Sequence, residues 1–209
     1  MITSWNGKPY HSLDYMLKER FGEKVYKVTL NGGMSCPNRD GTIGHGGCIF
    51  CSEGGSGDFA ASAALSIHEQ IDSQIAMLSA KRPIHEYIAY FQAYTNTYGE
   101  LESLKRKYEE ALAVDGVVGL VIGTRPDCMP DDLLRYLENL NKHTFLLVEY
   151  GIESTRDETL RRINRGHTFQ VTVNAVERTA ACGILTGGHV ILGLPGETHR
   201  SIVAVSYTH

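Results

Sequence analysis

The sequence predicts an α/β fold in which parallel strands alternate with helices. Five short runs rich in β-branched and aromatic residues are separated by stretches whose apolar residues recur with helical spacing. The repeating unit is roughly thirty residues long, which suits parallel strands joined by right-handed crossovers. Each run also ends in glycine and polar residues, and in parallel α/β sheets and barrels such clusters share the rim where substrates bind.

The expected strands are short enough for one layer of sheet and are bounded by turn residues. They are 24–31, 86–92, 117–123, 144–151 and 184–193.

Helices are expected between these strands. Ser66-Ile67-His68-Glu69 has the form of a capping box and opens the first one. Two more are indicated by apolar residues three or four positions apart: Leu101, Leu104, Tyr108 and Leu112 in one, and Leu133, Leu134, Leu137 and Leu140 in the other. A fourth is expected from about Thr168 to Gly183, because glycine suits a C-terminal cap.

Composition narrows the class of protein. A chain of 209 residues with 42% hydrophobic and 21% charged residues suits a single domain with one core. No run approaches the ~20 apolar residues of a membrane span, and the first residues lack a secretory pattern, so we expect a cytoplasmic protein without membrane contact. There the thiol pool is reducing, and the five cysteines favour metal binding or catalysis over disulfides.

The most informative stretch, residues 36–51, reads CPNRDGTIGHGGCIFC. Its three cysteines fall one short of the four ligands of a closed metal site. A zinc-stabilised binding module would need a fourth ligand, and His45 and His68 are the nearest candidates. An iron–sulfur cubane held by three thiolates would instead leave one iron open to a small molecule. We favour the cubane, because the C-x2-C pair has no second pair to mirror it.

The chain resembles radical S-adenosylmethionine (SAM) enzymes, although its C-x11-C-x2-C spacing is wider than their common C-x3-C-x2-C. Within them it resembles the branch of the radical catalytic subunit of Elongator-type tRNA acetyltransferases, and a bacterial group with the same CPNRDGTIG opening. The resemblance runs from about Tyr10 to Glu197 and includes later motifs: YFQAYTNTY, GTRPDC, VEYGIES, INRGH and HVILGLPGET. It implies a partial (β/α) barrel of the radical SAM type with about five of six βα units present, a core at 1–198 and a non-homologous tail, artefactual or disordered, at 199–209.

The resemblance also implies the cofactors. By similarity, Cys36, Cys48 and Cys51 ligate three irons of a 4Fe-4S cluster, and SAM chelates the fourth. The reduced cluster would cleave SAM and release a 5′-deoxyadenosyl radical that abstracts a hydrogen from the substrate. An external electron donor of the flavodoxin or ferredoxin type is therefore implied as a partner.

By the same similarity, eight residues are expected to contact SAM. They are Tyr94, Thr95 and Asn96 near the methionine amine, where the usual Gly-Gly-Glu is absent, Glu153 and Arg165 at the ribose and methionine carboxylate, and Thr124, His189 and Ile191 elsewhere around the cofactor. An alternative interpretation of His189 is a histidine whose hydrogen bonds are satisfied within the sheet. Arg125 is also interpreted as a residue that braces its own loop. Cys128 and Cys182 are interpreted as buried small apolar residues.

The kinship with Elongator suggests tRNA as the substrate, with modification of the wobble uridine as the hypothesis. The candidates for a cationic surface are Lys24, Lys27, Arg161, Arg162, Arg165 and Arg178. The net charge of −4 gives this hypothesis no support. A radical oxidoreductase acting on a small molecule or a porphyrin is the alternative, because VEYGIES and INRGH occur in those enzymes too. A further alternative is an inactive relative of these enzymes that binds both cofactors.

Overall fold

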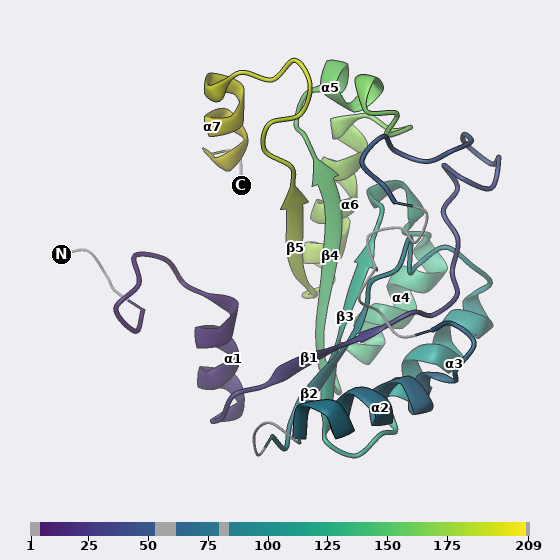
Figure 1. Ribbon diagram of the computed structural model, residues 1–209, viewed down its shortest axis with the longest axis vertical. Helices are drawn as coiled ribbons and strands as arrows, with labels where there is room; N and C mark the ends of the chain where they lie inside the picture. The colour runs from purple at the N-terminus through teal and green to yellow at the C-terminus, as the bar shows by residue number, and fades with distance from the viewer. Residues whose placement is uncertain (1–4, 53–61, 80–83, 208–209) are drawn as a thin grey trace.

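The computed structural model describes residues 5–52, 62–79 and 84–207. Within them, one sheet holds five parallel strands that follow one another in chain order (Figure 1). The strands are β1 (Tyr26–Leu30), β2 (Tyr87–Phe91), β3 (Val117–Thr124), β4 (Phe145–Glu153) and β5 (Leu185–Val190). Each overlaps the run that predicted it, so the α/β prediction is confirmed.

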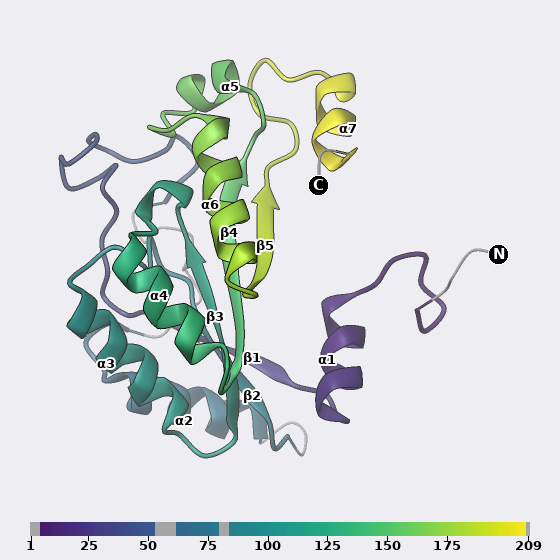
Figure 2. The same ribbon diagram turned by 180° about the vertical axis from the view of Figure 1, so that it is seen from behind.

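Four helices connect the strands and cover one face of the sheet (Figures 1 and 2). They are α2 (Ile67–Ser79), α3 (Leu101–Leu112), α4 (Asp131–Leu140) and α6 (Phe169–Ala181). The capping box before α2 is present as predicted: Ser66 Oγ accepts a hydrogen bond from the Glu69 amide at 3.1 Å, and the Glu69 carboxylate accepts one from the Ser66 amide at 2.8 Å. Gly183 follows α6 with a φ of 71°, the conformation of a C-terminal cap.

Successive side chains along each strand point to opposite faces of the sheet, and a hydrophobic core covers each face. The larger core contains Ala89, Leu120 and Leu146 together with the apolar faces of the four helices. The smaller core lies on the other face, where Ile88 and Val121 pack with Leu17 of helix α1 (Leu13–Phe21). The sequence did not lead us to expect α1. Ser12 caps its start and Gly22, with a φ of 81°, follows its end.

The outer edge of β1 is closed by side chains of α2. The Gln74 amide exchanges hydrogen bonds with the backbone N–H and C=O of Thr29, and the Gln70 amide does the same with Asn31. The two glutamines are four residues apart and so share one helix face. They satisfy backbone groups that an edge strand otherwise leaves unpaired.

The face opposite the four connecting helices is concave. Lys27 of β1 and Glu149 of β4 form an ion pair at 2.8 Å between Nζ and Oε1, although β2 and β3 lie between their strands. Neighbouring strands in a sheet are about 4.8 Å apart, so this contact requires the sheet to curve toward that face. The pair supports the partial barrel, which the solved structures compared below also support.

The remaining described helices are η1 (Pro126–Cys128, a 3-10 helix), α5 (Asp157–Arg162) and α7 (His199–Tyr207). Helix α7 lies in the predicted tail at 199–209, of which residues 208–209 fall outside the described residues. The division into core and tail stays a prediction. Across the described ranges, no helix combines the length and apolar character that a membrane crossing requires.

Candidate cluster and cofactor site

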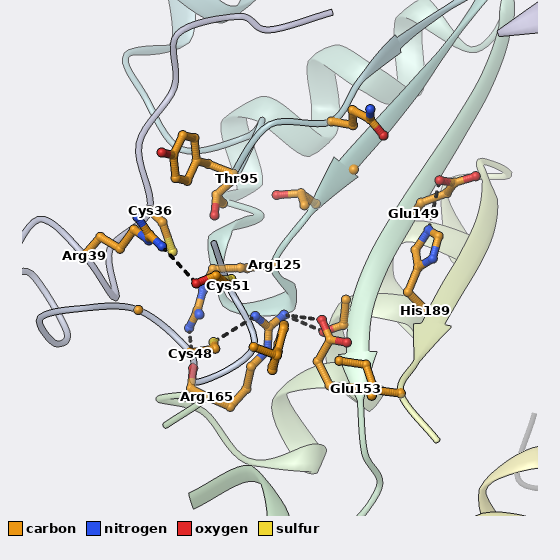
Figure 3. Close-up of a pocket in the computed structure, with 18 of the residues that line it drawn as sticks. Cys36, Arg39, Cys48, Cys51, Thr95, Arg125, Glu149, Glu153, Arg165 and His189 are labelled. Atoms are coloured by element: carbon orange, nitrogen blue, oxygen red, sulfur yellow. Dashed lines mark hydrogen bonds and ion pairs between the residues drawn. The ribbon is translucent and has the colours of Figure 1, made fainter. Parts of the chain in front are cut away.

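A pocket of about 370 Å³ lies at the carboxyl ends of the strands (Figure 3). Ligand sites usually measure roughly 300–1,000 Å³. Its walls come from the loop after β1 and from the ends of β2, β3, β4 and β5. This is the rim where parallel barrels and α/β sheets bind substrates, as the polar clusters after the strands predicted.

All three cysteines of the 36–51 loop line this pocket. Gly46 and Gly47, with φ values of 78° and 77°, turn the chain just before Cys48. The Cys51 amide then donates to the Cys48 carbonyl at 3.0 Å and closes a tight turn. The glycine-rich spacing therefore brings Cys48 and Cys51 to the same wall as Cys36.

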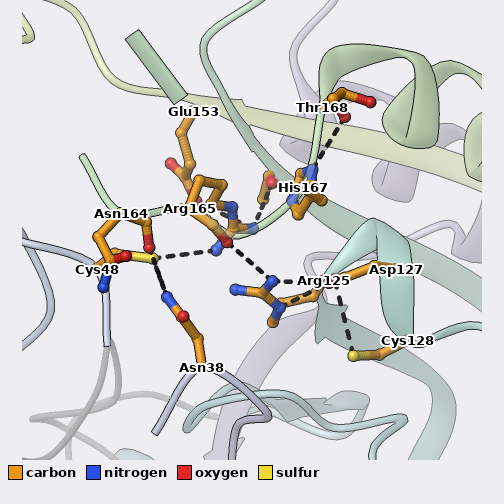
Figure 4. Close-up of polar contacts among 11 residues, drawn as sticks. Asn38, Cys48, Arg125, Asp127, Cys128, Glu153, Asn164, Arg165, His167 and Thr168 are labelled. Atoms are coloured by element: carbon orange, nitrogen blue, oxygen red, sulfur yellow. Dashed lines mark hydrogen bonds and ion pairs between the residues drawn. The ribbon is translucent and has the colours of Figure 1, made fainter. Parts of the chain in front are cut away.

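Cys48 has the most polar surroundings of the three (Figure 4). Asn38 Nδ2 lies 3.6 Å and an Arg165 guanidinium nitrogen 3.7 Å from its Sγ. A hydrogen bond from the Cys51 thiol lowers the pKa of Cys48 to about 5, and the charges of Arg165 and Arg125 act in the same direction. The same hydrogen bond raises the pKa of Cys51. Cys48 is therefore held as a thiolate, the form of cysteine that binds metal.

The arrangement does not suit a closed zinc site. His68, one proposed fourth ligand, lies on α2 and pairs with Asp72 at 3.3 Å. Among the residues with described positions, no three Cys, His, Asp or Glu side chains converge on a point where a single ion would sit. In a cubane each thiolate binds a different iron, so its ligands surround a larger object and need not converge. The three cysteines on one pocket wall therefore fit a cluster better than a single ion.

Glu153 and Arg165 contact each other next to Cys48. Arg165 lies 3.7 Å from Glu153 Oε1 and also donates to the Gly151 carbonyl. The pairing of β4 with β5 shifts by one residue between Gly151 and Glu153, a bulge of the kind that redirects side chains near active sites. A Cβ at Gly151 would lie 2.6 Å from the Glu153 carboxylate and 2.7 Å from an Arg165 guanidinium nitrogen, so a larger residue there would displace these two side chains. Burial raises the pKa of Glu153, although Arg165 opposes this effect.

Backbone strain is concentrated around this pocket. Four described residues other than glycine have positive φ: Asn6, Tyr94, Glu153 and Asn164. Tyr94 and Glu153 line the pocket, and Asn164 bonds through its side chain to the Gly47 carbonyl beside Cys48. Such conformations cost about 1–3 kcal/mol each and are typical of functional sites.

Several buried polar atoms at the pocket have no hydrogen-bond partner within the described part of the chain. They include Thr95 Oγ1, one terminal nitrogen of Arg125, and Arg165 Nε, all from residues that line the pocket. Buried polar groups are normally satisfied, so these atoms point to a polar ligand. Thr95 and Arg165 both belong to the set expected to contact SAM.

The other expected SAM contacts divide into two groups. Tyr94, Thr124, His189 and Ile191 line the pocket. Asn96 does not line it: its side-chain nitrogen donates to the Gly123 carbonyl at 2.8 Å and ties the ends of β2 and β3 together.

Arg125 does more than the sequence suggested. It pairs with Asp127 at 2.7 Å, donates to the Arg165 carbonyl at 2.9 Å and lines the pocket (Figure 4). Its interpretation as a loop brace is therefore apt, and the loop it braces is the one that carries Arg165.

Sequence reasoning missed Asn38, Arg39, Tyr90 and Glu149. Arg39, Tyr90 and Glu149 line the pocket, and Asn38 contacts Cys48. The best available signal was Glu149, a carboxylate inside the apolar run FLLVEYGIE, because charged residues are rarely buried without a partner.

Comparison with known proteins identifies the family of this chain. The family model of the radical SAM superfamily matches residues 39–205, a span that includes Cys48 and Cys51 and begins three residues after Cys36. The uncharacterized protein YtqA of Bacillus subtilis is 48% identical over 190 residues, 91% of this chain and 59% of that protein. Protein YhcC of Escherichia coli is 45% identical over 183 residues, 87% of this chain and 58% of that protein. The chain thus spans less than two thirds of the length of these relatives.

Among solved structures, archaeal Elp3 of Methanocaldococcus infernus, with an N-terminal deletion, matches with a TM-score of 0.59 at 19% identity, over 85% of this chain and 40% of that one. The cobalamin-dependent radical SAM enzyme OxsB with aqua-cobalamin bound matches with a TM-score of 0.51 at 15% identity, over 86% of this chain and 25% of that one. At these identities the matches show a shared fold, the one that the resemblance to Elongator-type enzymes predicted. Because the family model covers well over half of the chain, the chain belongs to the radical SAM superfamily, whose cofactors are a 4Fe-4S cluster and S-adenosylmethionine.

Proposed function

We propose that this chain forms the catalytic core of a radical SAM enzyme, with Cys36, Cys48 and Cys51 as the cluster ligands. The observation that carries the proposal is the convergence of these three cysteines with Glu153 and Arg165 on one pocket at the carboxyl ends of the strands. When bound, the reduced cluster supplies the electron that splits SAM and so generates a 5′-deoxyadenosyl radical for hydrogen abstraction from the substrate.

The protein's own residues would hold and orient the cofactor. Arg165, with its free Nε, suits the methionine carboxylate, and Glu153 suits the ribose hydroxyls. The unsatisfied Thr95 hydroxyl suits the methionine amine, and Ile191 offers an apolar contact to adenine. Contacts from Tyr94, Asn96 and Thr124 stay predictions.

Anaerobic reconstitution tests this proposal. The chain is incubated with iron and sulfide, reduced with dithionite in place of the flavodoxin- or ferredoxin-type donor, and supplied with SAM. We expect the absorbance of a 4Fe-4S cluster and the formation of 5′-deoxyadenosine. Replacing Cys36, Cys48 or Cys51 singly by Ala should abolish both.

Cys182→Ala is the matched control, since Cys182 follows α6 and does not line the pocket. This variant should keep the cluster and the cleavage of SAM. If any of the three pocket variants kept both, or if the chain took up one zinc ion instead of iron, the proposal would be wrong.

For the substrate, we propose the wobble uridine of tRNA, on the strength of the motifs shared with Elongator-type enzymes. Charge does not add support. Of the six basic residues considered, Lys27 pairs with Glu149, Arg162 with Glu158, Arg165 with Glu153 and Arg178 with Asp131. Four of the six candidate residues are thus already paired with carboxylates, so they give no support for a basic track that would bind tRNA.

Nucleoside analysis of tRNA tests the substrate separately. We expect a modified wobble uridine to be lost from cells that lack the full-length gene and to return when the gene is restored. An unchanged profile would exclude the tRNA proposal, leave the cofactor chemistry intact, and favour a small-molecule or porphyrin substrate.

A further inference from the structure

Glu149 and His189 lie at the end of the pocket away from the cysteines (Figure 3), and two further side chains, from β1 and β2, join them on the concave face. Glu149 is their centre. Its Oε1 lies 2.8 Å from Lys27 Nζ, and its Oε2 lies 3.0 Å from His189 Nε2. The Lys27 ammonium also lies 4.4 Å from the centre of the Tyr90 ring. We call Lys27, Tyr90, Glu149 and His189 the Glu149 cluster; of its members only His189 was expected from the sequence to contact SAM, and that expectation does not account for the other three.

The members differ in how they meet the pocket. The Glu149 side chain is 9% exposed and both of its oxygens are engaged, so it has little left to offer a ligand. The His189 side chain is 59% exposed. His189 lines the pocket, and because Nε2 is engaged with Glu149, Nδ1 is the ring nitrogen left for a ligand; no hydrogen bond of Nδ1 is found within the described residues.

Charge defines what this free edge can bind. Lys27 and Glu149 neutralise each other. The hydrogen bond to Glu149 raises the pKa of His189, and the charge of Glu153 adds to this effect while Lys27 opposes it. The Glu149 carboxylate itself stays ionised: hydrogen bonds from His189 and Lys27 outweigh burial and lower its pKa to about 2. The hydrogen bond to Glu149 therefore favours the protonated ring of His189, in which the second nitrogen carries an N–H donor.

The Glu149 cluster is separated along strand β4 from the end of the pocket that carries the cysteines. Glu149 and Glu153 lie on the same strand, four residues apart, which corresponds to about 13 Å. Glu153 contacts Arg165 beside Cys48, so the space between the two glutamates leaves room for the reacting part of a substrate.

We propose that His189 binds an anionic oxygen of the substrate, from a carboxylate or a phosphate group, and that Glu149 and Lys27 are positioning residues that hold His189 for this contact. The inference rests on the proposed function, because it assigns the substrate side of the same pocket. It places the anion at the end of the pocket where Glu149 and His189 lie, away from the cysteines.

The experiment uses the 209-residue chain without cluster or SAM, labelled with ¹³C-histidine and followed by NMR at constant ionic strength. His189 is assigned with the His189→Gln variant, which should fold because the side chain is exposed. Acetate and inorganic phosphate are titrated separately as probes. We expect at least one probe to shift the His189 signals to saturation near neutral pH, and the response to vanish as the pH rises above the pKa of His189.

The variants test the roles of the partners. Glu149→Gln should lower the pKa of His189 and weaken binding of the probe by about tenfold, the effect of losing one charge-assisted hydrogen bond. Lys27→Met should weaken binding less. His68 is the internal control, since it is exposed on α2 and also pairs with a carboxylate, yet lies outside the pocket; its signals should respond to neither probe.

The two probes separate the sources of the anion. Saturation by acetate alone indicates a carboxylate substrate, and saturation by phosphate alone or by both includes a phosphate. If His189 responds to neither, or only as His68 does, the inference is wrong. Because the measurement needs neither cofactor, its failure leaves the reconstitution result untouched, and failure of reconstitution does not alter the anion titration.

Discussion

The two edges of the sheet contrast with each other. The edge at β1 is closed, because Gln70 and Gln74 of α2 pair with its backbone and Lys27 reaches across the concave face to Glu149. The edge at β5 is open: among the described strands β5 pairs only with β4, and most of its residues are exposed, including Leu185 at 43%. Stability is therefore concentrated on the side of the sheet where side chains replace a missing neighbouring strand, and four variants test this difference.

The largest effect is expected from Gln70→Ala. The side chain is fully buried and makes hydrogen bonds to Asn31 N, Asn31 O and Leu65 O. At about 1 kcal/mol for each bond, the free energy of unfolding should fall by about 3 kcal/mol in chemical denaturation. Gln170→Ala, on the exposed face of α6, is the matched control and should change it by less than about 0.5 kcal/mol. Equal losses in both variants would show that α2 does not protect this edge.

Lys27→Met should have the next largest effect. It leaves the buried Glu149 carboxylate with His189 and Tyr90 as its partners but without the lysine charge, and breaking a buried ion pair costs about 3–5 kcal/mol. Because Lys27 is partly exposed, we expect a loss of about 2 kcal/mol, measured by the same denaturation. Lys18→Met removes an exposed ion pair with Asp14 and should cost less than about 0.5 kcal/mol. A loss as small as this control's would mean that the cross-sheet pair does not brace the β1 edge.

A smaller effect is expected from pH. The pKa of Glu149 is lowered from 4.5 to about 2 in the folded chain. Its contribution is therefore fully present above pH 4.5 and is lost as the pH falls toward 2. The difference in unfolding free energy between the wild type and Glu149→Gln should shrink by about 1.5 kcal/mol between pH 4.5 and about pH 3. A difference that stays constant across this range would contradict the assignment.

The smallest effect is expected at β5. Leu185→Lys places a charge on the open edge, where the leucine side chain is already in contact with water. The free energy of unfolding should change by less than about 0.5 kcal/mol. Self-association at high protein concentration, measured by sedimentation velocity, should decrease, because charged residues on an edge strand oppose pairing with a second chain. Unchanged sedimentation would show that the edge of β5 does not mediate association between chains.

The same contrast explains what the sequence could predict. Local patterns sufficed for the five strands, the capping box at Ser66 and the glycine after α6, since each depends on neighbours a few residues away. The pairing of Lys27 with Glu149 joins residues 122 positions apart and depends on the curvature of the sheet, which no local pattern specifies. Helix α1 was missed although Ser12 and Gly22 mark both of its ends.

For the site, the sequence predicted which residues take part better than it predicted where each side chain lies. The cysteine spacing indicated a common wall for Cys36, Cys48 and Cys51, and the family motifs brought Glu153 and Arg165 to the same pocket. The Asn96 side chain is held outside the pocket lining by a tertiary hydrogen bond to the Gly123 carbonyl, and the bulge that directs Glu153 arises from the pairing of β4 with β5. Neither is visible in a single sequence.

The left-handed backbone at Tyr94, Glu153 and Asn164 has a consequence for how ligands enter. Tertiary packing imposes these three unfavourable conformations during folding, so the walls already have their final shape before any ligand arrives. Little reorganisation of the pocket is then needed when a ligand binds, which favours tight binding of small molecules. A glycine at Tyr94 should relax the backbone there, whereas at Glu153 or Asn164 it would also remove the ion pair with Arg165 or the hydrogen bond to the Gly47 carbonyl.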